Sequence, residues 1–351
     1  MSTMSRRESR SKDLLRQLLR EYYIGAELWL PNDYPMREFA FQTYENEVYV
    51  RHMAFQSVGS LRDYLMDETP RQAYFSAALY RDPAAENMED KGWLGSELMF
   101  DIDSDHLPGC GEGSVVVNGR KIPVVRRECM QKAKEEVVKL VDVITEDLGF
   151  SRSDIVIYFS GNRGFHVVVL TKNNEWRTLP SHLRKEIVDY ITGRGLDPEI
   201  IVPRVPKKAI LLPPTKNMGG WRGRLARLNL TYENLLNNLQ HVIDVAGVHI
   251  DEMVTQDISR LIRIPGTING KSGLPAIKLS LPNEFNKFNY GPHLSPFKCS
   301  AIVLSQVKKK IKFEFMDVKY SLFPSLRMKV PCYVAVFMAL NRLVRIDSLI
   351  H

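Results

Sequence analysis

Residues 95–103 constrain this chain most, because they read as a buried strand that ends in two carboxylates one residue apart. Alternate side chains of a strand share a face, so the apolar ones would enter a core while Asp101 and Asp103 leave the sheet together. Their Cα atoms would lie roughly 7 Å apart. From that spacing both carboxylates can reach a pair of divalent cations about 3.5–4 Å apart. Taken alone, such a pair is more often a solvated turn than a metal site, so the choice between the two depends on other residues of the chain.

Composition sets the class of protein. The chain has 351 residues, 44% of them hydrophobic and 25% charged, which suits one large domain or two modest ones. A formal net charge of +7 favours a polyanionic partner such as nucleic acid, although a solvated surface fits it as well. The longest apolar run covers only residues 333–340 and the N-terminus is polar, so we expect a cytoplasmic protein with no membrane segment.

Cysteine spacing bears on metal and redox chemistry. The four cysteines are Cys110, Cys129, Cys299 and Cys332, and none of them belongs to a Cys-x-x-Cys pair. This spacing argues against a zinc knuckle. We expect isolated thiols in a reducing compartment.

Hydrophobic periodicity predicts alternating helices and strands. Helices are expected at 13–23, 61–66, 127–148, 181–192 and 232–245, and from Asp251 to about Ile262. Strands are expected at 37–41, 47–55, 72–80, 98–103, 154–160, 165–170 and 275–280. The first two strands should form an antiparallel pair, and the glycines of 161–164 predict a hairpin.

That hairpin tip, Ser160-Gly-Asn-Arg163-Gly-Phe-His166, is the second chemical cluster. Its glycines let the backbone turn tightly and approach a ligand, while Arg163 and His166 would supply positive donors. A hairpin tip with Arg and His is more often a plain exposed turn. Beside a two-acid strand it becomes a plausible clamp for a triphosphate.

The third cluster runs from 249 to 273 and contains Asp251, Arg263 and the glycine-flanked Lys271. Residues 266–272 are similar to a P-loop, but the first glycine of that motif would fall at Pro265, so we reject a P-loop ATPase. Asp251 on its own reads as a helix N-cap.

Together the three clusters resemble the catalytic subunit of archaeal and eukaryotic DNA primases, most strongly the archaeal small subunit. The resemblance covers most of residues 12–350, and segments 37–39, 49–51, 100–103, 160–166 and 251–273 carry it. It implies an α/β (α+β) fold. In this fold, mixed sheets flanked by helices form the primase core, at 12–172 and 246–350, and a mostly helical insertion covers 173–245. We expect residues 1–11 to be a disordered basic segment.

The resemblance also implies which residues act. Asp101, Asp103 and Asp251 would be catalytic and would bind two Mg²⁺ or Mn²⁺ ions. The nucleotide's triphosphate would be faced by Ser160, Arg163, His166 and Arg263, with Asn269 and Lys271 in the following loop. Glu38 and Arg51 match family positions near the active site.

Two departures from the family pattern stand out. Family members commonly carry a zinc-binding cluster just after the two-acid strand, whereas only His106, Cys110 and Cys129 stand there in this chain. We therefore expect no structural zinc. Asn269 replaces a histidine that the family often has, so a phosphate contact at this position should be weaker than one from a charged imidazole.

We therefore expect a DNA primase that makes short RNA primers, or also DNA primers, from nucleoside triphosphates on single-stranded DNA. It would work with a large subunit as a heterodimer, near the nucleoid of an archaeal cell. Two alternatives stay open, a stand-alone primase-polymerase of repair or plasmid replication and an inactive nucleic-acid-binding scaffold. Metal-dependent incorporation of labelled nucleotides on a single-stranded template separates these possibilities.

Overall fold

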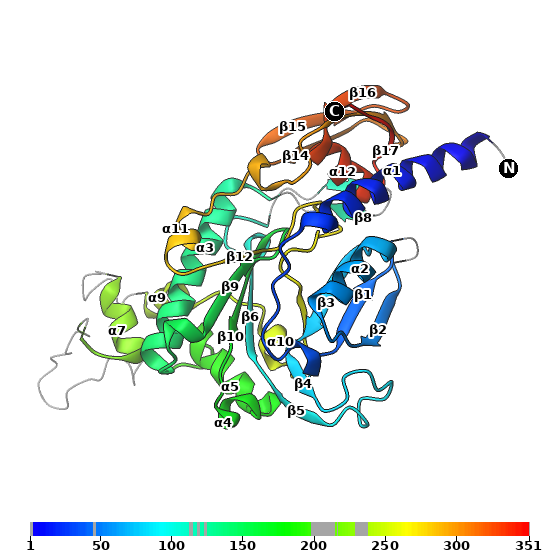
Figure 1. The fold of residues 1–351 in the computed structure, drawn as a ribbon. Coiled ribbons are helices and arrows are strands. Elements are labelled where there is room, and N and C mark those ends of the chain that lie inside the picture. The colour runs from blue at the N-terminus through cyan, green and yellow to red at the C-terminus, as the bar shows by residue number, and fades with distance from the viewer. Residues whose placement is uncertain are drawn as a thin grey trace, which may run out of the picture.

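The computed structural model describes residues 3–44, 47–111, 115–117, 120–122, 125–197, 215, 217–228 and 238–350 (Figure 1). It combines helices with antiparallel sheets, which confirms the predicted α+β class. Among the helices of these residues, none is both long and apolar enough to cross a lipid bilayer.

One four-stranded sheet contains the two-acid strand. Its order is β12 (Ile277–Leu279), β9 (Ile155–Phe159), β10 (Gly164–Val169) and β6 (Leu98–Asp103), all antiparallel. Strands β9 and β10 form the predicted hairpin. Helix α3 (Arg127–Asp142) packs on β6 and β10, and a π-helical turn, η3 (Val143–Asp147), follows it.

A second four-stranded sheet has the order β11 (Leu261–Arg263), β3 (Gln72–Ser76), β1 (Phe39–Gln42) and β2 (Tyr49–Met53). The predicted antiparallel pair of the first two strands is confirmed by β1 and β2. The helix expected from Asp251 to Ile262 was too long, since α10 (Glu252–Gln256) is short and the chain then joins this sheet as β11. Pairing with β3 outweighs local helical periodicity there.

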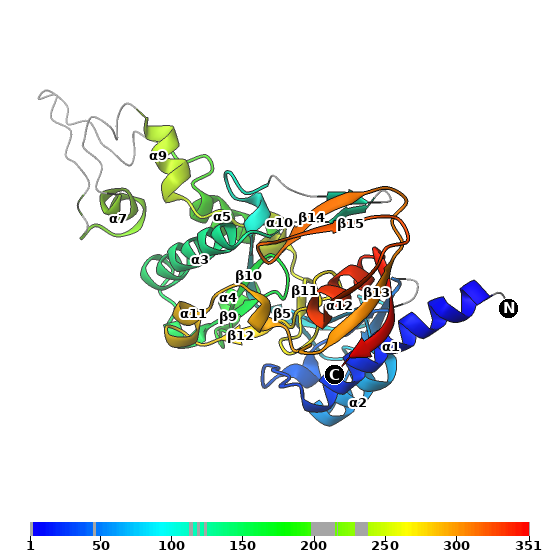
Figure 2. The same cartoon turned by 90° about the horizontal axis from the view of Figure 1, so that it is seen from above.

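The N-terminus differs from the prediction of a disordered segment at 1–11. Helix α1 (Thr3–Gly25) begins at the first described residue and packs on α2 (Val58–Glu68) and on the C-terminal strand (Figures 1 and 2). Leu15, Leu18 and Leu19 are buried in the core, so the helix is held by tertiary packing.

The C-terminal region forms a further layer. A three-stranded sheet of order β16 (Arg327–Pro331), β13 (Ser300–Ser305) and β17 (Val344–Ile350) packs against α12 (Cys332–Leu340). A separate hairpin is made by β14 (Ile311–Phe315) and β15 (Val318–Leu322). Figure 2 shows α12 beside β13 in this layer.

The prediction of isolated thiols was wrong. Cys110 is bonded to Cys129, and Cys299 to Cys332. Their sequence separations of 19 and 33 residues gave no sign of pairing, because only the tertiary fold brings the Cα atoms to 5.7 and 5.1 Å.

Between β10 and α10 the described chain is helical. It contains α4 (Asn174–Arg177), α5 (Ser181–Thr192), α7 (Gly220–Arg227) and α9 (Leu239–Ala246). Trp221, Leu225, Val242 and Ile243 form a small core of their own, whereas Ile191 of α5 joins the main core. Much of the helix expected at 232–245 falls outside the described residues, and α9 covers its end.

Short elements complete the described chain. They are η1 (Tyr34–Met36), β4 (Ala78–Tyr80), β5 (Trp93–Ser96), η2 (Ser104–His106), β7 (Val115–Val117), β8 (Arg120–Ile122), η4 (Arg152–Asp154), α11 (Asn283–Lys287) and η5 (Pro292–Leu294). The single strand expected at 72–80 is thus divided into β3 and β4.

A buried ion-pair network fixes the entry to β6. Glu97, fully buried just before that strand, accepts hydrogen bonds from Arg37 Nη2 and Arg177 Nη2, both at 2.9 Å. Arg184 donates to the Ser96 and Glu97 carbonyl oxygens at 2.7 and 2.9 Å. Three arginines from three segments therefore hold the point at which the two-acid strand begins.

A glycine sets the distance between β6 and β10. A Cβ added at Gly164 would lie 2.0 Å from the Ile102 carbonyl oxygen. We predict that Gly164→Ala lowers the free energy of unfolding by about 1–3 kcal/mol, the usual cost of forcing a methyl group into packed structure.

Urea denaturation measures this change. The matched control is Gly59→Ala in α2, where the new Cβ would lie 3.6 Å from Ser57 Oγ, an ordinary contact. The control should be as stable as the unmodified chain or slightly more stable. A Gly164→Ala protein as stable as the control would contradict the close approach.

Candidate active site

The register of β6 against β10 places the first two acids. Asp101 lies opposite His166, and Asp103 lies opposite Gly164. Opposite residues of antiparallel strands share a face, so both acids and His166 project on the same side of the sheet. Their side chains are 11–13% exposed. The sequence prediction of two acids leaving the sheet together is confirmed.

The third predicted acid reaches this place from far along the chain. The Asp251 N–H donates to the Asp101 carbonyl oxygen at 2.8 Å, which ties the start of α10 to β6. Asp251 Oδ1 also accepts from the Met253 N–H at 3.1 Å, so the helix-cap prediction is confirmed. The cap thus lies beside the two acids.

Asp101 is the most perturbed of these acids. Burial raises its pKa well above the usual value, and the nearby charges of Asp103 and Asp251 raise it further. Its Oδ1 atom is buried and has no hydrogen-bond partner among the described residues. Carboxylates crowded in this way favour a cation between them, so the residues fit the metal ions expected from the sequence.

Arg163 places a positive charge beside two of the carboxylates, Asp103 and Asp105. Arg163 donates to Asp103 Oδ2 from Nε at 2.9 Å, and its Nη1 donates to Asp105 Oδ2 at 2.8 Å. Arg163 Nη2 also lies 2.7 Å from Asp103 Oδ2. The hairpin arginine predicted to face a triphosphate therefore neutralises two carboxylates in this structure.

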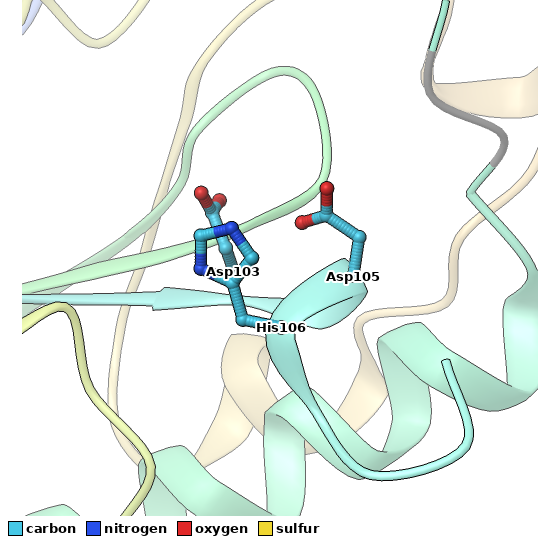
Figure 3. Close-up of side chains that lie close together, drawn as sticks. All are labelled: Asp103, Asp105 and His106. Carbon is cyan, nitrogen blue, oxygen red and sulfur yellow. The ribbon is translucent and has the colours of Figure 1, made fainter. Parts of the chain in front are cut away.

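Asp105 was not predicted as a site residue. Figure 3 shows Asp103, Asp105 and His106 turned toward one another, and one ligand atom from each lies within 4.8 Å of the others. This group could hold a metal ion, although it includes neither Asp101 nor Asp251. The signal in the sequence was an acid at every second position, which η2 continues past the end of the strand.

His166 has a different charge from the one predicted. Burial, helped by Arg263 and Arg260, lowers its pKa to about 3, so the imidazole is neutral at neutral pH. Its Nε2 lies 3.6 Å from Asp101 Oδ1. The expectation of a positive donor at this position was wrong, because the sequence did not show how deeply the fold buries the imidazole.

Arg263 lies at the end of β11, next to β3. It contacts Gln72 Oε1 and donates to the Tyr74 hydroxyl at 3.2 Å, with its guanidinium 4.9 Å from the centre of the Tyr74 ring. Its side chain is largely buried, and Nε has no partner among the described residues. A buried cation with an unpartnered donor, close enough to His166 to lower its pKa, is suited to a polyanionic ligand.

The hairpin tip and the 269–273 loop are bonded together. Asn269 Nδ2 donates to the Ser160 carbonyl oxygen at 3.2 Å, and Asn269 Oδ1 accepts from the Lys271 N–H at 2.9 Å. Ser160 Oγ accepts from the Gly164 N–H at 3.3 Å. Asn269 therefore joins the two segments, and the Lys271 side chain is exposed.

Glu38 and Arg51 form a cluster on the second sheet. Arg51 Nε donates to Glu38 Oε1 at 2.9 Å, and Lys91 Nζ lies 3.6 Å from Glu38 Oε2. Burial alone would raise the pKa of Glu38, but Arg51, the His52 N–H and Lys91 hold it below the usual value. Glu38 and Arg51, which match family positions near the active site, are thus partners of each other.

A cavity of about 580 Å³ adjoins the acids. Asp103 and Asp251 line one part of it, and His241 and Asp244 of α9 line another. The cavity therefore lies between the strand that ends in the acids and the helical segment before α10.

Comparison with known proteins agrees with this geometry. The family model of the DNA primase small subunit matches residues 100–280, more than half of the chain. The chain belongs to the DNA primase small-subunit family. DNA primase small subunit PriS of Aeropyrum pernix is 37% identical over 93% of this chain and 91% of its own length. PriS of Sulfurisphaera tokodaii is 34% identical over 96% and 98%, and PriS of Saccharolobus solfataricus 35% over 97% of each.

This primase-family chain carries a disulfide in the segment after the two-acid strand, where we expect no zinc cluster. The Cys110–Cys129 bond joins the loop after η2 to α3, close in sequence to His106. The expectation of no structural zinc stays a prediction. Metal analysis of the purified primase-family protein would test it.

The raised pKa of Asp101 predicts a stability effect. A group whose pKa is higher in the folded state stabilises the fold when protonated, and that contribution is lost as pH rises. Without divalent metal, Asp101→Asn should therefore raise the free energy of unfolding by about 0.5–2 kcal/mol, the usual gain from a single stabilising substitution.

Thermal denaturation from about pH 9 to about pH 5 tests this, with the gain shrinking as pH falls and Asp101 takes up its proton. Asp63→Asn, at an exposed position of α2, is the matched control and should change little at any pH. A less stable Asp101→Asn protein at high pH would show that the charge of Asp101 is satisfied by the fold.

The Arg163 bridge predicts competition with metal. Arg163→Gln removes a cation that holds Asp103 and Asp105, so metal ions no longer have to displace it. Mn²⁺ affinity of the nucleotide-free protein, measured by calorimetry, should rise about tenfold, or about 1.4 kcal/mol.

Arg152→Gln serves as control, because Arg152 contacts Asp142, outside the acid group. It should leave Mn²⁺ affinity unchanged. Weaker Mn²⁺ binding by Arg163→Gln would mean that the arginine orients the carboxylates for metal instead of competing with it.

Proposed function

We propose that this chain is the catalytic subunit of a DNA primase, which joins nucleotides into short RNA or DNA primers on single-stranded DNA. The observation that carries the proposal is that Asp251 lies beside Asp101 and Asp103, with Asp101 Oδ1 buried and without a hydrogen-bond partner among the described residues. Membership of the primase small-subunit family supports the same reaction.

In this reaction the oxygen of an acceptor hydroxyl bonds to the α-phosphorus of a nucleoside triphosphate. Pyrophosphate leaves, and the hydroxyl loses its proton. Asp101, Asp103 and Asp251 would hold two Mg²⁺ or Mn²⁺ ions, with Asp105 and His106 beside them. Bound metal supplies a lower pKa for the acceptor hydroxyl and neutralises charge on the leaving pyrophosphate.

The chain's own cations would bind the triphosphate. Arg263 of β11 and Lys271 of the following loop would contact the phosphates, and Ser160, whose Oγ accepts from the Gly164 N–H, would shape the hairpin that approaches them. His166 would contribute a neutral N–H donor. Arg163 would pass from the acids to the phosphates once metal neutralises Asp103, and Asn269 would keep the two loops in register.

The acceptor strand would approach from the other side of the acids. The cavity of about 580 Å³ offers room there, bounded by Asp103 and Asp251. Relatives named as small subunits imply a larger partner subunit. We propose that this partner strengthens template binding and initiation.

Replacing Asp101, Asp103 or Asp251 by Asn keeps side-chain volume and removes charge. We predict that each change lowers labelled-nucleotide incorporation at least about a hundredfold, because loss of a metal ligand removes several kcal/mol of transition-state stabilisation. Binding of single-stranded DNA should stay near the unmodified level.

The control Asp63→Asn should incorporate nucleotides normally. Near-normal turnover by Asp101→Asn would contradict the metal assignment. An unmodified chain that binds DNA but incorporates nothing, alone or with its large subunit, would favour the inactive scaffold.

A further inference from the structure

Positive charge is concentrated at the C-terminal end of the chain. Residues 300–350 contain nine Lys and Arg against three Asp and Glu, an excess of six in a chain whose formal net charge is +7. Nearly all of the net charge therefore belongs to β13–β17, α12 and their loops. The proposed catalytic chemistry uses none of it.

Part of this charge lines a hollow outside the active site. A cavity of about 410 Å³ is bounded by Lys12 of α1, Arg71 before β3, and Arg342 and Arg345 near the C-terminus. A second hollow of about 240 Å³ is lined by Arg10, Arg327 and the same Arg345. Figures 1 and 2 show α1 passing beside β17, which brings these distant segments together. We name the two hollows together the arginine groove.

Few carboxylates balance this groove. Glu47 Oε1 lies 3.4 Å from Arg71 Nη1 and 3.1 Å from Arg342 Nη2. Asp347 is shared in the same way by Arg345 and Arg327, at 3.3 and 3.4 Å. Each acid thus serves two guanidinium groups, and Arg10 and Lys12 add two exposed cations. The surplus favours an anionic ligand.

The groove is connected to the nucleotide loop. A Cβ added at Gly270 would lie 2.2 Å from Arg71 Cγ, so the loop packs directly on this arginine. Asn341 Nδ2 donates to the Lys271 carbonyl oxygen at 2.7 Å. Gln72, the neighbour of Arg71, contacts Arg263 and accepts from the Gly270 N–H. The groove and the nucleotide loop therefore adjoin each other.

We infer that the arginine groove binds the phosphodiester backbone of single-stranded DNA. A strand fits better than a free triphosphate because cations line two hollows that share Arg345, and successive phosphates of one strand can occupy both. Guanidinium groups suit phosphate oxygens, and such contacts carry no base preference. As a template track this site rests on the proposed primase function, but its binding can be measured without catalysis.

The test uses Lys12→Gln/Arg342→Gln, which changes two exposed residues that line the first hollow. Binding of a fluorescent oligodeoxythymidylate is followed by anisotropy without metal or nucleotide, between about 50 and 200 mM salt. Loss of two phosphate contacts should make the slope of log affinity against log salt shallower by about 1.4. Affinity should fall about tenfold at 200 mM salt.

The matched control is Lys312→Gln/Lys319→Gln, which removes the same charge from the β14–β15 hairpin of the same region. It should change the slope much less. If a melting curve shows that the first variant is unfolded, Arg10→Gln/Arg327→Gln in the second hollow takes its place.

Three results would overturn the inference. They are an unchanged slope in the groove variant, an equal change in the control, and DNA affinity that is unchanged while the KM for nucleoside triphosphate rises. The last result would assign the groove to free nucleotide. The two proposals can fail separately. If the unmodified chain incorporates no nucleotide while the groove variant still binds DNA more weakly than the unmodified chain, the primase proposal is rejected and the groove remains a DNA-binding site.

Discussion

The close approach of β6 and β10 is the constraint on which the rest of the site depends. Gly164 lets the hairpin come within reach of the Ile102 carbonyl, and the register that follows sets Asp101 opposite His166. A shift of one residue would turn both acids to the other face of the sheet. The same register delivers Arg163 to Asp103 and Asp105. Geometry and electrostatics of the site thus have a common origin in one strand pair.

The site collects charges that the fold does not fully pair. Asp101 is buried with a raised pKa, Arg263 is buried with an unpartnered Nε among the described residues, and His166 is kept neutral between them. Such an arrangement reduces stability and is typical of functional sites. The network of Arg37, Arg177 and Glu97 lies at the opposite end of β6, where Glu97 Oε1 accepts from both arginines. These ion pairs fix the start of the strand, and the acids lie at its other end.

The catalytic site and the arginine groove share one loop. Residues 269–273 are bonded to the hairpin through Asn269 and to α12 through Asn341, and they pack on Arg71. Phosphates on either side of this loop would meet cations. The cations of the arginine groove therefore lie next to the loop that the catalytic site also uses, where the phosphates of a bound nucleic-acid strand would meet them.

The sequence by itself determined the local elements of the site. Strand alternation placed Asp101 and Asp103 on one face, glycines specified the hairpin, and Asp251 was recognised as a cap, because these features depend on near neighbours. Tertiary structure decided the rest. The partner of Arg163, the neutral charge of His166, the cysteine pairs and the helix at residues 3–11 all depend on contacts distant in sequence. Charge state and pairing follow burial and distance, and both exist only once the chain is folded.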